Sequence, residues 1–150
     1  DLRFGSVAEL DASTSSGDVR VDDVAVDMST TSVSGDIAAG TVAGRLVATT
    51  ASGDVRVARA GGQVIIGTTS GDVRVDHFDG AELTVKSVSG DVELGLPSGI
   101  RVEPDLSTLS GRTRLPAPAT ALPPPQASPR RVVRLHVLTV SGDITIERTV

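Results

Sequence analysis

The sequence predicts an all-β protein built as a single-stranded parallel β-helix, or β-solenoid, and three observations support this. First, the tripeptide Ser-Gly-Asp recurs along the chain, with central glycines at 17, 35, 53, 71, 90 and 142 and a Ser-Gly-Arg variant around Gly111. Second, the near-constant period of about 18 residues is typical of stacked repeats, none of which buries its apolar face alone. Third, apolar and polar residues alternate around each tripeptide without helical periodicity. We therefore expect about seven coils, wound right-handed because parallel crossover connections nearly always are.

Small apolar side chains must fill the interior of these coils. The only aromatic residues among the 150 are Phe4 and Phe78, so the core has to consist mainly of Val, Leu, Ile, Ala and Thr, which favour strands. The net charge of −5 argues against a general nucleic-acid-binding protein, because such proteins usually show a basic face. Since the chain contains no cysteine, disulfides, thiol catalysis and cysteine-ligated metals are excluded.

The alternation also predicts which residues face inward. Two and four residues after each glycine the chain is mostly apolar, as at Val73 and Val75. Two residues before the glycine it is apolar in several copies, as at Val33 and Val88. We therefore expect one strand of about eight residues to run through the tripeptide, with the Thr/Ser row three residues before the glycine, which includes Thr68, facing outward. A shorter strand should precede it, with residues seven and five before the glycine facing inward.

The chain is expected to form one β-solenoid domain over residues 1–150, as a fragment of a longer protein because it begins directly with a repeat. Residues 116–131 contain six prolines, which cannot join a ladder of backbone donors. We predict a disordered, proline-rich excursion there, within the penultimate coil, as a tolerated loop or alternatively as a ligand for a partner. No apolar run approaches the roughly 20 residues of a membrane-spanning helix.

A longer phrase, T-x-S-G-D-V/I-x-V/I, occurs at residues 50–57, 68–75 and 139–146, together with Ser-Gly-Arg at 110–112 and a proline-rich gap before the last copy. This pattern covers nearly the whole chain and resembles the bacterial adhesin-like family of β-strand repeat proteins. The resemblance implies a single-chain β-helix and brings no catalytic motif. Arginine is used almost to the exclusion of lysine, with Lys86 the sole lysine, which fits a high-GC actinobacterial source.

The aspartates of the tripeptides are the most conspicuous candidate site. Stacking in register would place them about 4.8 Å apart, where two exposed carboxylates repel by roughly 0.9 kcal/mol in water. The simplest interpretation is that each carboxylate accepts hydrogen bonds at the bend. Calcium is the alternative, although calcium-binding nonapeptides need G-G-x-G-x-D rather than one glycine per coil. The calcium candidates are Asp18, Asp36, Asp54, Asp72 and Asp91; no other metal site and no cofactor is expected.

A second candidate surface is a row of arginines three residues after the glycine. Its members are Arg20, Arg56, Arg74 and Arg114. They could contact an anionic partner such as a lipid headgroup or an envelope polymer, but Ala38 and Glu93 interrupt the row, so a solvated salt-bridge lattice is the simpler interpretation. Neither His77 nor His136 has a partner spacing typical of a catalytic or metal site, and we expect no enzyme.

The sequence therefore favours a non-catalytic structural or interaction module that contacts a protein or a cell-envelope component and not nucleic acid. The alternative is a ligand- or ion-responsive binding domain in bacterial envelope-stress sensing. End-to-end self-association is a further expectation, because uncovered sheet ends pair with other chains. The resemblance favours the cell envelope or another extracytoplasmic location over the cytoplasm.

Overall fold

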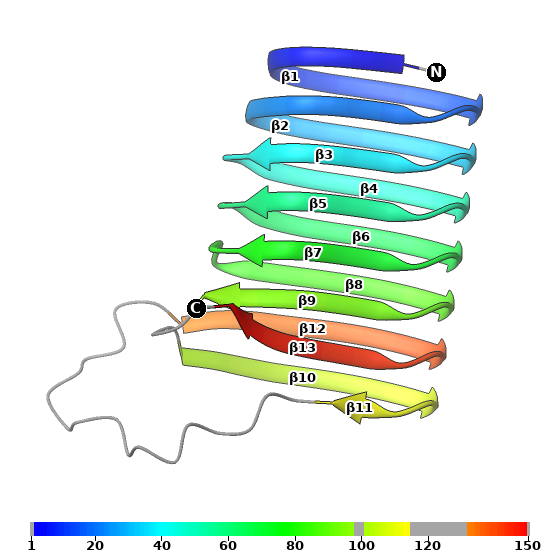
Figure 1. Cartoon of the computed structure of the whole chain (residues 1–150), viewed down its shortest axis with the longest axis vertical. Helices are drawn as coiled ribbons and strands as arrows, with labels where there is room; N and C mark the ends of the chain where they lie inside the picture. The colour runs from blue at the N-terminus through cyan, green and yellow to red at the C-terminus, as the bar shows by residue number, and fades with distance from the viewer. Residues whose placement is uncertain (1, 98–100, 115–131, 150) are drawn as a thin grey trace, which may run out of the picture.

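The computed structural model describes residues 2–97, 101–114 and 132–149, and every regular element in them is a β-strand (Figure 1). The strands are β1 (Leu2–Ser16), β2 (Val19–Ser34), β3 (Ile37–Val42), β4 (Arg45–Ser52), β5 (Val55–Ala60), β6 (Gln63–Ser70), β7 (Val73–Phe78), β8 (Glu82–Ser89), β9 (Val92–Pro97), β10 (Arg101–Ser110), β11 (Thr113–Arg114), β12 (Val132–Ser141) and β13 (Ile144–Thr149). All pairs between them are parallel. The predicted all-β parallel solenoid is confirmed; its handedness stays a prediction. Among the described residues no helix is long and apolar enough to cross a membrane.

The strands form two walls that face each other across the core (Figure 1). Wall A contains the strands that follow a tripeptide: β3, β5, β7, β9, β13 and β11, in stacking order. Wall B contains the strands that precede one: β4, β6, β8, β12 and β10. The long strands β1 and β2 contribute to both walls, since the first half of β2 pairs with β3 and its second half pairs with β4.

Apolar side chains from both walls fill the space between them. On β7, Val73 and Val75 are 1% exposed, and on β6, Val64 and Ile66 are equally buried. Among the described residues these rows are buried as predicted two and four residues after the glycine and seven and five residues before it, except in the final layer, where Thr113 is exposed. Phe78 is fully buried and is the largest side chain in the core. Burying each Val, Leu or Ile side chain contributes roughly 1.5–3 kcal/mol, so the repeated small apolar residues supply most of the driving force for stacking.

The prediction of a continuous strand through the tripeptide is wrong, because Ser-Gly-Asp is a corner between the walls. Wall B strands end at the serine and wall A strands begin one residue after the aspartate, as at Ser70 and Val73. The Thr/Ser row three residues before the glycine, predicted to face outward, is buried at Thr68. The row two residues before the glycine, predicted to face inward, is exposed at Val33 and Val88. A corner breaks the period of two, so the inward phase of one strand does not pass to the next.

The stacking order also differs from the order along the chain. β12 lies between β8 and β10, and β13 lies between β9 and β11, so the last coil of the sequence is inserted beneath the β8–β9 corner (Figure 1). The continuous solenoid accordingly has about five turns rather than the predicted seven. The final layer is formed by β10 and the two-residue β11. The predicted excursion at 116–131 lies outside the described residues.

Candidate interaction surface

The corner is built on a column of glycines. Gly17, Gly35, Gly53, Gly71, Gly90 and Gly142 all have positive φ, between 122° and 154°. A Cβ added at Gly71 would lie 2.1 Å from the carbonyl oxygen of Gly53, the glycine of the neighbouring corner. The same contact recurs between successive corners, for example 2.2 Å from Gly53 to Gly35. Only glycine fits here, both because of its backbone conformation and because adjacent corners approach so closely.

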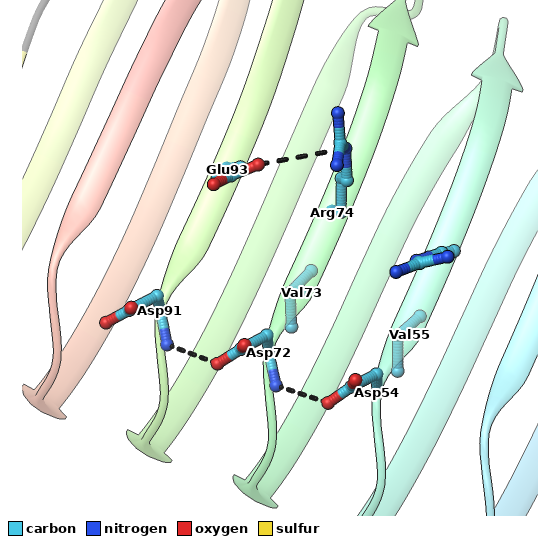
Figure 2. Close-up of a pocket in the computed structure, with 8 residues that line it drawn as sticks. Asp54, Val55, Asp72, Val73, Arg74, Asp91 and Glu93 are labelled. Atoms are coloured by element: carbon cyan, nitrogen blue, oxygen red, sulfur yellow. Dashed lines mark hydrogen bonds and ion pairs between the residues drawn. The ribbon is translucent and has the colours of Figure 1, made fainter.

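The aspartates of adjacent corners are joined by hydrogen bonds. The backbone N–H of Asp72 donates to Oδ1 of Asp54 at 3.0 Å, and the N–H of Asp91 donates to Oδ1 of Asp72 at 3.0 Å (Figure 2). The complete ladder consists of Asp36 to Asp18, Asp54 to Asp36, Asp72 to Asp54, Asp91 to Asp72, Asp143 to Asp91 and Arg112 to Asp143. Each carboxylate therefore caps a backbone donor of the next coil, which offsets the repulsion between neighbouring charges.

This ladder explains the inserted coil. Every inner corner both donates an N–H and offers a carboxylate, and Asp143 does so between Asp91 and Arg112. Arg112 has an N–H to donate, at 2.9 Å, but no carboxylate to offer. A corner without a carboxylate suits only the last place in the row, since a following N–H would lose its acceptor. The Ser-Gly-Arg corner accordingly lies at the end of the stack, although Ser-Gly-Asp comes later in the sequence.

The calcium candidates do gather in one row, but one oxygen of each ladder carboxylate is already used by the fold. The bonded oxygen is Oδ1 in Asp36, Asp54, Asp72 and Asp91 alike. In the part of the chain that the structure describes, no group of three or more His, Asp or Glu side chains is arranged to hold a metal ion. At Asp54 and Asp72 the ladder uses Oδ1 and does not use Oδ2.

The arginine row is only partly assembled. Arg56 and Arg74 are neighbours in register, whereas Ala38 separates Arg20 from Arg56. Arg114 lies beside Thr145 at the end of the stack and does not adjoin Arg74. The Nε of Arg74 lies 2.9 Å from an oxygen of Asp76 and 3.7 Å from one of Glu93, and all three side chains are more than half exposed. Such pairs contribute little stability, so this row is a surface feature.

A shallow groove separates the aspartate row from the arginine row. One stretch of about 140 Å³ has Asp54, Asp72 and Asp91 on one side and Arg74 and Glu93 on the other (Figure 2), and Arg56, beside Arg74 in register, also lines it. A second stretch of about 130 Å³ continues it toward Asp18 and Arg20. The corner thus presents a row of carboxylates beside a partly formed row of guanidinium groups along one edge of the solenoid, with Val55 and Val73 also lining the groove. These charged groups can make ionic contacts and hydrogen bonds with a ligand.

Two features were missed by reading the sequence. Hydroxyls of the buried Thr/Ser row, among them Thr50, Thr68 and Thr139, are shielded from solvent and make no hydrogen bond in the described residues. They were missed because the predicted strand phase placed this row on the outer surface. His136 Nδ1 lies 3.0 Å from Oδ2 of Asp105, across the pairing of β12 with β10. Both residues lie six positions before the central glycine of consecutive coils, so the repeat period was the signal that could have paired them.

The comparisons with known proteins agree with this architecture. No curated protein and no solved structure matches the chain. The family described as Toastrack DUF4097 matches residues 5–147, which is almost the whole sequence. This match supports the β-solenoid fold that the adhesin-like resemblance implied and leaves the adhesin role and the bacterial source as predictions. The chain belongs to the Toastrack DUF4097 family.

Proposed function

We propose that this chain is a non-catalytic, adhesin-like interaction module whose Ser-Gly-Asp corner binds a partner protein or a component of the bacterial cell envelope. The observation that carries the proposal is the hydrogen-bonded ladder. It fixes the carboxylates of successive coils at the strand spacing, about 4.8 Å. Because a hydrogen bond already holds each carboxylate, the side chain loses little conformational entropy when a partner binds. A pre-ordered row of this kind binds a repeating partner at low entropic cost.

The groove narrows the chemistry of the partner. Asp54, Asp72 and Asp91 line one side and Arg56 and Arg74 the other, so a partner with positive and negative groups at similar spacing contacts both. An extended peptide or a zwitterionic envelope polymer has this character. Because the carboxylates are partly or fully exposed, the contacts are ionic and weaken as salt rises.

Binding assays with purified envelope material test this proposal. Labelled protein would be sedimented with bacterial cell-wall preparations and with vesicles of anionic or zwitterionic lipid. The test variant carries Asp54→Asn, Asp72→Asn and Asp91→Asn, which keeps the Oδ1 acceptor of each ladder bond and removes three charges. The control variant carries Glu9→Gln, Asp11→Asn and Asp22→Asn, exposed acids outside the groove. Binding that is lost in the first variant and kept in the second supports the proposal; absence of wild-type binding, or equal loss in both variants, refutes it.

A second candidate function is an ion-responsive domain in envelope-stress sensing. It is favoured by the second carboxylate oxygen of Asp54 and Asp72, which the ladder does not use. Calcium prefers several oxygen ligands, and binding to the native state would raise the melting temperature in proportion to the logarithm of calcium concentration. A saturable increase with calcium but not with magnesium, at physiological salt, supports sensing. An unchanged melting temperature eliminates it.

A further inference from the structure

The outer face of the five middle strands of wall B is almost free of charge, whereas the strands on either side carry outward acids, Asp11 on β1 and Asp105 on β10. The outward positions of five adjacent strands form it, and we call them the flat face: Ser29, Thr31 and Val33 of β2; Val47, Thr49 and Ala51 of β4; Ile65, Gly67 and Thr69 of β6; Thr84, Lys86 and Val88 of β8; and His136, Leu138 and Val140 of β12. Among these, Val33 is 55% exposed, Val88 49% and Val140 42%. Lys86 is the only lysine, arginine or acid in this set. Exposed apolar side chains grouped on a surface with so little charge make it a candidate interface.

One edge of the flat face carries a row of charges with a symmetric order. In stacking order from β2 to β12 the outward residues eight before each glycine are Asp27, Arg45, Gln63, Glu82 and Arg134. Their signs read negative, positive, neutral, negative, positive. Read from the opposite end, every sign is inverted. Within these five strands the row is complementary to a reversed copy of itself; β1 and β10 carry Glu9 and Glu103 at the same position, so the complementarity ends at β2 and β12.

We propose that the flat face is the interface of a homodimer, with a two-fold axis that runs parallel to β6 and passes over it. This axis reverses the stacking order of the partner copy, so Arg45 faces the partner's Glu82 and Asp27 faces the partner's Arg134. Each contact occurs twice, as in any isologous interface. Gln63 meets its own equivalent at the centre of the row. The alternative two-fold axis, along the stack, would place the charged row against the row of Val33, Ala51 and Val88, where no opposite charge is available.

A second observation points to the same axis. Gly67 lies in the middle of β6, at the centre of the flat face, and a Cβ added there would meet nothing within 4 Å. The chain's own fold therefore does not require glycine at this position. Glycine weakens a strand interior and often marks the close approach of another backbone. On the proposed axis, Gly67 meets Gly67 of the second copy, where the absence of side chains lets the two walls approach.

The remaining groups on the face are compatible with burial. Lys86 lies opposite Thr49 of the second copy, whose hydroxyl accepts a hydrogen bond from the ammonium group. Strand and sheet spacings give a face of about 24 by 26 Å, or roughly 600 Å² for each copy, near the lower end of stable interfaces. We therefore expect a reversible dimer. This inference does not depend on the proposed function, because it uses the wall opposite the one that carries the arginine row.

Analytical ultracentrifugation of the full chain, from low micromolar to near-millimolar concentration, tests the dimer. We expect a reversible monomer–dimer equilibrium. Gly67→Arg brings two guanidinium groups together on the axis and should weaken association by at least about tenfold, since opposed like charges are strongly unfavourable. Thr49→Arg, opposite Lys86, should also weaken association. It is the substitute variant if Gly67→Arg does not fold. A wild-type monomer throughout, a mass that keeps growing with concentration, or a dimer unaffected by the variants that fold refutes the proposal.

Charge reversal separates contacts between copies from contacts within one chain. Arg45→Glu should weaken the dimer, by about tenfold or more, and adding Glu82→Arg to the same chain should restore it by rebuilding both contacts with opposite polarity. Within one chain the double variant places like charges beside Asp27 and beside Arg134, so it would be worse than either single change. Arg59→Glu on wall A is the matched control and should leave association unchanged. Failure of the second charge to restore the dimer overturns the assignment.

Discussion

Replacement of Gly71 by alanine is the sharpest test of the stacked corner. The Cβ of alanine would lie 2.1 Å from the carbonyl oxygen of Gly53, far inside the usual contact distance of about 3.5 Å. The backbone φ of 142° adds strain of about 1–3 kcal/mol for a residue with a side chain. Relief of the clash separates two corners that are joined by Gly53 N–H to Ser70 O at 3.1 Å, Val55 N–H to Asp72 O at 2.9 Å and Asp72 N–H to Asp54 Oδ1 at 3.0 Å.

Each of these hydrogen bonds contributes about 1 kcal/mol, so together with the strain Gly71→Ala should lower the free energy of unfolding by about 4–6 kcal/mol. Gly67→Ala, four residues earlier in β6, is the matched control, because its Cβ enters open space and the loss of backbone freedom in the unfolded chain should leave stability unchanged or raised by up to about 1 kcal/mol. Urea unfolding followed by circular dichroism, at concentrations where the chain is monomeric, gives both values. Similar effects of the two substitutions, or a loss below about 1 kcal/mol at Gly71, would refute the account of the corner.

Three further predictions follow from the ladder, the core and the strand order. Asp72→Asn keeps the acceptor for the next coil and should change the free energy of unfolding by less than about 1 kcal/mol, whereas Asp72→Ala removes it and should cost about 1–2 kcal/mol; equal values in urea unfolding would mean that the ladder bond is unimportant. Thr68→Val replaces a buried hydroxyl that has no partner by a methyl group of the same shape, so the melting temperature should be unchanged or higher, and a clear decrease would reveal a hidden partner. Because the chain has no cysteine, paired cysteines report the order of the strands: Thr84→Cys with His136→Cys, neighbours in register, should oxidise to a disulfide, and Thr84→Cys with Asp105→Cys should not, because another strand separates them. If non-reducing gels showed the reverse outcome, the strands would stack in the order of the sequence, with β10 beside β8.

The proposed function and the proposed dimer use different parts of the solenoid. The groove lies along the Ser-Gly-Asp corner and the start of wall A, and the flat face lies on wall B. A dimer formed through wall B leaves the corner grooves of both copies exposed. Two pre-ordered charge rows in one particle would raise avidity for a repeating envelope partner without any new contact.

Much of the fold could be read from the sequence because stacking repeats the same environment in every coil. The period located the corners, and the apolar rows that include Val64, Val73 and Val75 identified the core, since a side chain that is inward in one coil is inward in all. The aspartate ladder could also be anticipated, because like charges at the strand spacing need compensating donors. These inferences are local and depend only on residue type and spacing.

The tertiary structure alone decided the phase across the corner, the order of the last coils and the groups that meet across strands. A glycine with positive φ turns the chain between walls, so the alternation before Gly71 says nothing about the alternation after it. The place of Arg112 at the end of the stack depends on which corner offers a carboxylate to which N–H, a contact between residues 31 positions apart. The symmetric charge order from β2 to β12 likewise emerges only when β12 is placed beside β8. Pairing between distant strands fixes these features, and the physical reason is that hydrogen bonds between coils depend on neighbours in space, which the order of residues along the chain does not specify.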